Sequence, residues 1–150
     1  MRHMKTKLTL MVVATAVAFA CARCFAQDPG LLAGSEIKGT TVKNLQNETI
    51  GEINEVLIEP MTARVRFVVL SVGGFLGLGS TEVAVPWGAF QITKEGDKTK
   101  WVLDATKERL EKAPKVEGKN YERLYVRDTA EPIFIYWEET WVVEPENVQP

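Results

Sequence analysis

The chain has 150 residues, enough to bury the core of one domain, and its composition excludes several classes of function. It carries 18 basic and 20 acidic residues, a net charge of −2, and four of the basic residues lie within the first 26 positions. Without those four the net charge is −6, and this acidic balance argues against nucleic acid or anionic lipid as a partner. The single histidine and both cysteines lie at positions 3, 21 and 24, so the rest of the chain lacks the groups needed for Ser-His-Asp or Cys-His catalysis, for His or Cys zinc sites and for disulfides.

The N-terminal segment has the features of an export signal. A basic start precedes the 13-residue apolar run Leu8–Ala20, and small-x-small cleavage sites end at Ala20 and at Ala26. We favour cleavage near Ala26, because the polar, turn-rich stretch that starts at Gln27 then begins the mature protein. Residues 1–26 are therefore predicted to be a signal peptide, which places the protein in the periplasm or outside the cell.

Two alternatives would keep the chain attached to a membrane. A transmembrane anchor made of the apolar run would span about 20 Å, short of the roughly 30 Å hydrocarbon core. A lipid on Cys21 is disfavoured, because the bulky Phe19 fits that processing site poorly. We therefore expect no stable membrane insertion after cleavage.

Residues 31–114 contain six short strand-like segments at the spacing of hairpins, which predicts a small antiparallel barrel. The predicted strands are Thr40–Lys43, Thr49–Ile58, Arg64–Val72, Thr81–Val85, Trp87–Thr93 and Lys100–Leu103. In the second strand the apolar alternation slips between Ile50 and Val56, which predicts a β-bulge near Asn54 and Glu55. The third and fourth strands flank the glycine-rich loop Gly73–Gly79, a hairpin signal.

Short helices are predicted on both sides of these strands. Leu31–Lys38 has the composition of a lead-in with one helical turn, capped by Ser35. Asp104 is predicted to cap a second helix over Ala105–Lys112. Trp87 follows Pro86 at the end of a buried strand, so we expect its ring to plug the core.

The composition shifts at residue 115, where a C-terminal extension begins and continues to residue 150. Tyr121, Leu124 and Tyr125 have the i, i+3, i+4 spacing of a short helix. Ile133–Trp137 and Trp141–Val143 are aromatic and β-branched, so they are predicted to be extended segments that cover a face of the barrel or add an edge strand.

Five stretches within residues 31–114 follow the order and spacing of a known family. They are Gly39-Thr40-Thr41-Val42, Ile50-Gly51-Glu52-Ile53, Arg64–Val72 with the glycine-rich loop, Val83-Ala84-Val85-Pro86-Trp87 and Leu103-Asp104-Ala105-Thr106-Lys107. With them the chain resembles the PRC-barrel domain, which is found in the H subunit of the photosynthetic reaction centre and in a ribosome maturation factor.

The resemblance implies a mainly β fold, namely a small six-stranded antiparallel barrel with a short C-terminal helix, here followed by an aromatic C-terminal extension. It also implies a general role, as a stable barrel that docks other proteins or small ligands. It carries over no catalytic residue, because the family has no shared active site.

Two functions fit these observations. The first is an exported adaptor module that docks a protein partner in the cell envelope, through the apolar loop tip and the aromatic extension. The alternative is a periplasmic barrel that binds a small ligand in a cleft lined by the aromatic residues of the extension. The predicted binding residues are Phe75, Leu76 and Leu78 at the loop tip, and Tyr136, Trp137 and Trp141 in the extension.

We expect no enzymatic activity, cofactor or metal site. The carboxylates of Glu52, Glu55 and Glu59 are interpreted as a solvated strand face. Glu138 and Glu139 are adjacent and would point in opposite directions in an extended segment, so they are a poor acid–base pair.

Overall fold

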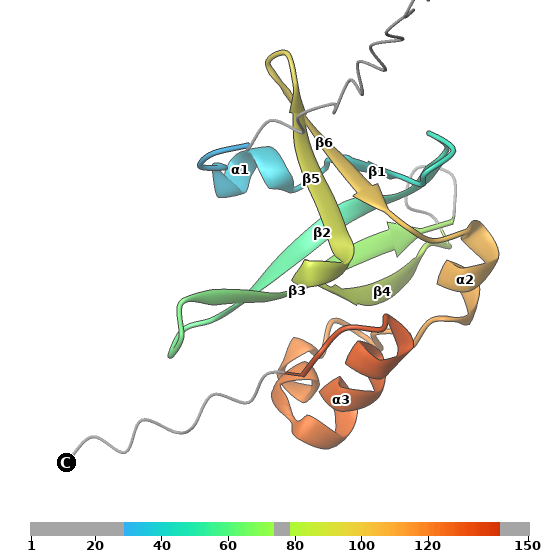
Figure 1. The fold of residues 1–150 in the computed structure, drawn as a ribbon. Coiled ribbons are helices and arrows are strands. Elements are labelled where there is room, and N and C mark those ends of the chain that lie inside the picture. Colours follow the sequence, from blue (N-terminus) through green and yellow to red (C-terminus); the bar gives the residue numbers. More distant parts are fainter. Residues whose placement is uncertain (1–28, 74–78, 142–150) are drawn as a thin grey trace, which may run out of the picture.

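The computed structural model describes residues 29–73 and 79–141, which form one six-stranded sheet with short helices around it (Figure 1). The strands are β1 (Thr41–Lys43), β2 (Thr49–Glu59), β3 (Arg64–Val72), β4 (Thr81–Pro86), β5 (Phe90–Glu95) and β6 (Lys98–Leu103). The helices are α1 (Gly34–Ile37), α2 (Lys107–Lys112) and α3 (Arg127–Tyr136), with 3₁₀ turns η1 (Trp87–Ala89) and η2 (Tyr121–Tyr125). Among these described residues, no helix is long and apolar enough to cross a membrane.

The predicted antiparallel barrel is corrected in two respects. The strand order is β4-β3-β2-β1-β6-β5, so the sheet is not closed and β4 and β5 lie at its two edges. The sheet is also mixed, because β1 pairs antiparallel with β2 but parallel with β6, where Val42 lies opposite Trp101. Hairpin reasoning joins only strands that are neighbours in the chain, and the parallel pair joins two strands that are far apart in sequence.

The predicted bulge in β2 is confirmed. Ile53 pairs with Leu70 and Glu55 pairs with Val69, so Asn54 is the extra residue. A second register shift follows between Leu57 and Ile58, where the extra residue is Arg66 of β3. Each extra residue bends its own strand and changes which of that strand's side chains face the core. The end of β2 therefore has a different phase from its beginning.

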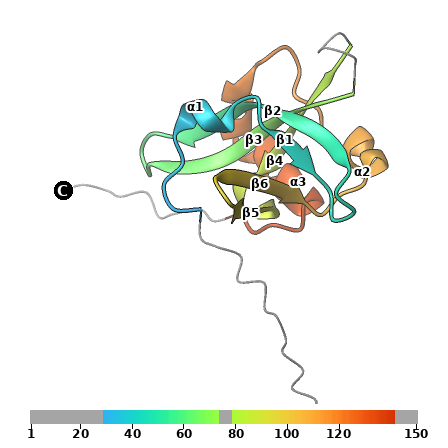
Figure 2. The same ribbon diagram turned by 90° about the horizontal axis from the view of Figure 1, so that it is seen from above.

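The core lies around β3, whose residues from Phe67 to Leu70 are all buried. This agrees with the fully apolar end of the predicted strand, which needs cover on both faces. The extension supplies part of that cover, because Phe134 of α3 packs edge-on against Phe67 with the ring centroids 5.1 Å apart. In Figure 1, α3 lies next to β4, and Figure 2 shows α1 and α2 at opposite ends of the sheet.

The prediction of an extended segment over Ile133–Trp137 is wrong, because these residues form the end of α3 and its C-cap. The buried side chains Ala130, Ile133, Phe134 and Trp137 follow the i, i+3, i+4, i+7 spacing of one helical face. Burial of that face outweighs both the β-branched composition and Pro132 inside the helix. Of the segment Trp141–Val143, only Trp141 is described, and it is not in a strand.

The other helices agree with the predictions except at their caps. The hydroxyl of Thr106, not Asp104, accepts a hydrogen bond of 3.1 Å from the Arg109 N–H at the start of α2. Ser35 lies inside α1 and makes no capping hydrogen bond. Trp87 is half-buried, and its ring packs edge-on against the buried Trp101 at 5.2 Å.

Candidate interaction surface

The aromatic residues predicted to bind a ligand attach the extension to the sheet. Trp137 is 5% exposed, and its indole N–H donates a hydrogen bond of 3.1 Å to the carbonyl of Ala84 on the edge strand β4. The hydroxyl of Tyr136 donates to the carbonyl of Arg109 at 2.6 Å. The guanidinium of Arg109 in turn lies over both rings, 5.8 Å from the Tyr136 centroid and 5.3 Å from that of Trp137. Together these contacts join α3 to β4 and α2.

Trp141 makes a separate set of contacts. Its ring meets Phe134 edge-on at 5.1 Å, and the guanidinium of Arg66 lies 4.5 Å from its centroid. Arg66 also forms a 2.6 Å ion pair with Glu59. Trp141 therefore fixes the chain beside the start of β3, whereas Tyr136 and Trp137 contact α2 and β4. The other predicted binding residues, Phe75, Leu76 and Leu78, lie outside the described residues.

A more open apolar surface lies between β2 and η2, where a cavity of about 290 Å³ is found. We call it the β2–η2 groove. It is lined by Val56, Leu57, Ile58, Glu59, Arg66, Phe67, Tyr121, Glu122, Leu124 and Tyr125. Phe67 and Leu124 are buried and belong to the core, so the groove is an opening onto the core of the domain.

Two large apolar side chains at the groove remain exposed to solvent. Ile58 is 61% exposed and Tyr125 is 64% exposed. Ile58 follows the second register shift, at which Arg66 is the extra residue on the facing strand β3. Exposed apolar side chains around a cavity are typical of surfaces that bind another molecule.

The end of the groove near β3 holds a paired charge. The Arg66 guanidinium donates two hydrogen bonds to the Glu59 carboxylate, at 2.6 and 3.2 Å, and the Thr62 hydroxyl donates a third. Burial raises the pKa of Glu59, but the bonds from Arg66 and Thr62, with the charges of Arg66 and Arg64, outweigh it and lower the pKa below the ordinary 4.5. The prediction that Glu59 lies on a solvated strand face is therefore wrong. Its carboxylate is part of a fixed ion pair with Arg66.

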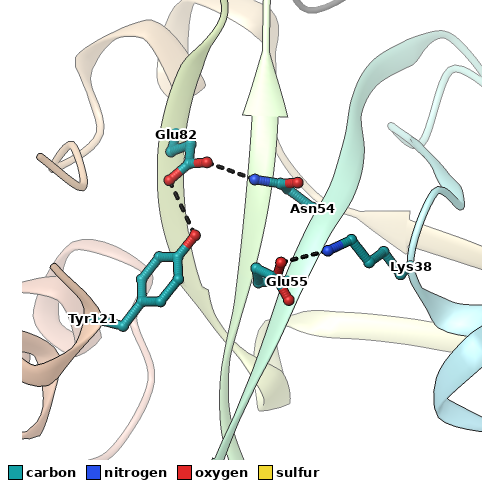
Figure 3. Close-up of polar contacts among 5 residues, drawn as sticks. All are labelled: Lys38, Asn54, Glu55, Glu82 and Tyr121. Atoms are coloured by element: carbon teal, nitrogen blue, oxygen red, sulfur yellow. Dashed lines mark hydrogen bonds and ion pairs between the residues drawn. The ribbon is translucent and has the colours of Figure 1, made fainter. Parts of the chain in front are cut away.

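Two carboxylates next to Tyr121, a residue of η2 that lines the groove, are held in polar contacts. Figure 3 shows Glu82 of β4 accepting hydrogen bonds from the Asn54 amide and, at 3.3 Å, from the Tyr121 hydroxyl. Glu55 is paired with Lys38 close by. Burial raises the pKa of Tyr121 to about 12, together with the charge and hydrogen bond of Glu82 and the charge of Glu55. The phenol therefore stays protonated at neutral pH.

A second cavity of about 580 Å³ lies between the ends of β2, β3 and β4 and helix α2. Its lining includes the hydroxyl-bearing Thr49 and Ser71 and the charged residues Lys107, Glu111 and Lys115. It is separate from the β2–η2 groove, with which it shares no lining residue. Among the described residues, no group of three His, Cys, Asp or Glu is placed to hold a metal ion.

Sequence reasoning did not identify the β2–η2 groove. Its two walls are separated by more than 60 residues, so no local spacing joins them. The signal that was present is the broken alternation of β2, which predicted the first bulge but not the second shift that precedes Ile58. The short helix predicted from Tyr121, Leu124 and Tyr125 is confirmed as η2, although its position on the sheet could not be deduced.

The family model described as "PRC-barrel domain" matches residues 29–110, which is more than half of the chain. No curated protein matches the sequence. The match ends within α2, so the groove combines β2 of the matched region with η2 of the extension.

Proposed function

The chain belongs to the PRC-barrel family, and on that premise we propose that it is an adaptor module that docks a protein partner in the cell envelope through the β2–η2 groove. Domains of this family often act as generic interaction modules. The observation that carries the proposal is the apolar groove of about 290 Å³ with Ile58 and Tyr125 exposed at it. A partner side chain placed there would remove both from water, at roughly 25 cal/mol per Å² of apolar surface buried.

We also propose that the module is exported and acts without catalysis. The basic start and the apolar run Leu8–Ala20 support export, with cleavage near Ala26. The lack of His and Cys after residue 24 supports a binding role, because the commonest nucleophilic mechanisms need one of them. N-terminal sequencing of the protein from a periplasmic extract should give a start at or near Gln27, and an intact Met1 in the cytoplasm would contradict export.

Site-specific photo-crosslinking tests the docking proposal. A photoreactive phenylalanine analogue at position 58 should link the protein to a discrete partner in cells that produce it. The matched control is position 135, because Ile135 is 69% exposed on α3 and does not line the groove. Adducts of equal yield from both positions, or none from position 58, would refute docking at the groove. The analogue at position 76 tests the predicted loop tip of Phe75, Leu76 and Leu78 in the same experiment.

The alternative function, a periplasmic barrel that binds a small ligand, is supported by the cavity of about 580 Å³, a size common among ligand sites. Its hydroxyls and lysines would favour a polar or anionic molecule. Native mass spectrometry of the protein purified from its own periplasm tests this alternative. A bound small molecule that is lost in Ser71→Leu, which fills the cavity, would favour it over docking.

A further inference from the structure

We propose that the partner segment bound by the β2–η2 groove carries an apolar anchor residue next to a lysine or arginine, and that this cation meets the η2 end of the groove. The inference rests on the proposed docking function and specifies its partner. It is drawn from the unequal distribution of charge between the two ends of the groove.

The apolar part of the groove sets the requirement for an anchor. Leu57 is half-buried, while Phe67 and Leu124 are buried. These side chains offer no hydrogen-bonding group of their own, so a polar side chain placed among them would lose its hydration without compensation. An aliphatic or aromatic side chain pays no such cost and also covers Ile58 and Tyr125.

The β3 end of the groove offers no unpaired charge to a partner. The carboxylate of Glu59 is held by Arg66, and the side chains of the two residues are only 10% and 19% exposed. The charge of Arg64 also acts on Glu59. A charged side chain of a partner, whether cation or anion, would therefore have to compete with an existing ion pair here.

The η2 end differs because it holds a carboxylate that has no ionic partner among the described residues. Glu122 lines the groove there, whereas Glu82 and Glu55 do not line it and are already bonded, and η2 also carries the exposed cation Arg123. Glu122 lines the groove and is exposed, so its carboxylate can reach a bound segment. A lysine or arginine beside the anchor residue would pair with the Glu122 carboxylate.

Three dansyl-labelled peptides test the inference by fluorescence anisotropy with the full mature chain. They are Ser-Lys-Leu-Phe-Lys-Ser, Ser-Glu-Leu-Phe-Glu-Ser and Ser-Lys-Ser-Ser-Lys-Ser. The first should bind about tenfold more tightly than either of the others at low salt, and its advantage over the acidic peptide should shrink at high salt because screening weakens the charge contacts.

Variants locate the binding site and its polarity. Ile58→Ser should weaken binding of the first peptide about fivefold or more, whereas Ile135→Ser should not change it. Glu122→Gln should weaken it about two- to fivefold, whereas Glu95→Gln in the distant β5–β6 hairpin should leave it unchanged. All four positions are exposed, so the fold should be kept, which circular dichroism can verify.

The outcomes separate this inference from the proposed function. Equal or tighter binding of the acidic peptide, equal binding of the peptide without an apolar anchor, or no effect of Ile58→Ser would overturn the inference. If none of the peptides binds while crosslinking at position 58 captures a partner, the groove docks a segment of different chemistry and the inference is wrong. If both experiments fail, the docking function is itself refuted.

Discussion

Replacing Trp137 with alanine should destabilise the domain by about 3–5 kcal/mol, the range for truncating a large aromatic side chain in a core. The ring is 5% exposed and belongs to the same hydrophobic core as β3. It also contacts Tyr136 edge-on at 5.3 Å, an arrangement worth about 0.5–1.5 kcal/mol beyond area burial. The substitution removes these contacts and the hydrogen bond to Ala84 together.

Trp137→Phe isolates the contribution of the hydrogen bond. Phenylalanine keeps an aromatic ring on α3 but has no N–H to donate to the Ala84 carbonyl, and the loss of one such bond costs about 0.5–1.5 kcal/mol. The smaller ring adds a modest packing cost, so Trp137→Phe should fall well below Trp137→Ala. The matched control is Tyr125→Ala, because Tyr125 is in the same extension but 64% exposed, and it should change stability by less than about 0.5 kcal/mol.

Urea unfolding of the mature chain, followed by far-UV circular dichroism, measures these differences. We expect a single transition for the wild-type chain, because α3 and β3 share one core. A loss below about 1 kcal/mol for Trp137→Ala would refute the packing argument. An early, separate transition that removes only helical signal would show that the extension folds independently of the sheet.

Three further predictions concern single side chains. Because the pKa of Tyr121 is raised to about 12, its contribution to stability should be complete below pH 10 and lost as the pH rises toward 12. The free energy of unfolding should therefore fall less steeply with alkaline pH in Tyr121→Phe than in the wild-type chain, and equal slopes would contradict this. Because the pKa of Glu59 is lowered in the folded protein, its contribution to stability should be present above about pH 4.5 and lost as the pH falls through the folded-state pKa. Glu59→Gln should therefore make the unfolding midpoint less dependent on acidic pH, and a pH dependence equal to that of the wild-type chain would refute the buried pair. In Gly51→Ala the new Cβ would lie 3.1 Å from the Ser71 carbonyl oxygen, so thermal unfolding should show that the domain is less stable by about 1–3 kcal/mol. The control Gly34→Ala, whose Cβ would have no neighbour within 4 Å, should show no loss of stability.

The strands could be read from the sequence because their signals are local. The apolar run of β3 and the turn residues on each side of it fix a buried strand without reference to the rest of the chain. The broken alternation of β2 located the bulge at Asn54 for the same reason. Asn47 adopts a φ of 65° in the turn before β2, a conformation that asparagine tolerates. The family itself followed from the order of such local segments.

The helix α3 shows where a local signal was present but outweighed by a competing one. Ile133, Ile135 and the neighbouring aromatic residues have high β propensity, yet Ala130, Ile133, Phe134 and Trp137 follow helical spacing. Propensity is a weak preference, and the burial of one helical face against Phe67 decides the conformation. The spacing predicts the helix correctly once the segment is known to pack against a single surface.

The parallel pair of β1 with β6, the open edges of the sheet and the β2–η2 groove are decided by the tertiary structure alone. Each depends on segments that are distant in the chain, and the sequence pattern of a strand does not specify which distant strand it pairs with. The groove lies where β2, the start of β3 and the distant η2 come together. Local residue patterns therefore determine the elements of this protein, whereas its candidate binding surface arises from long-range packing that no local pattern encodes.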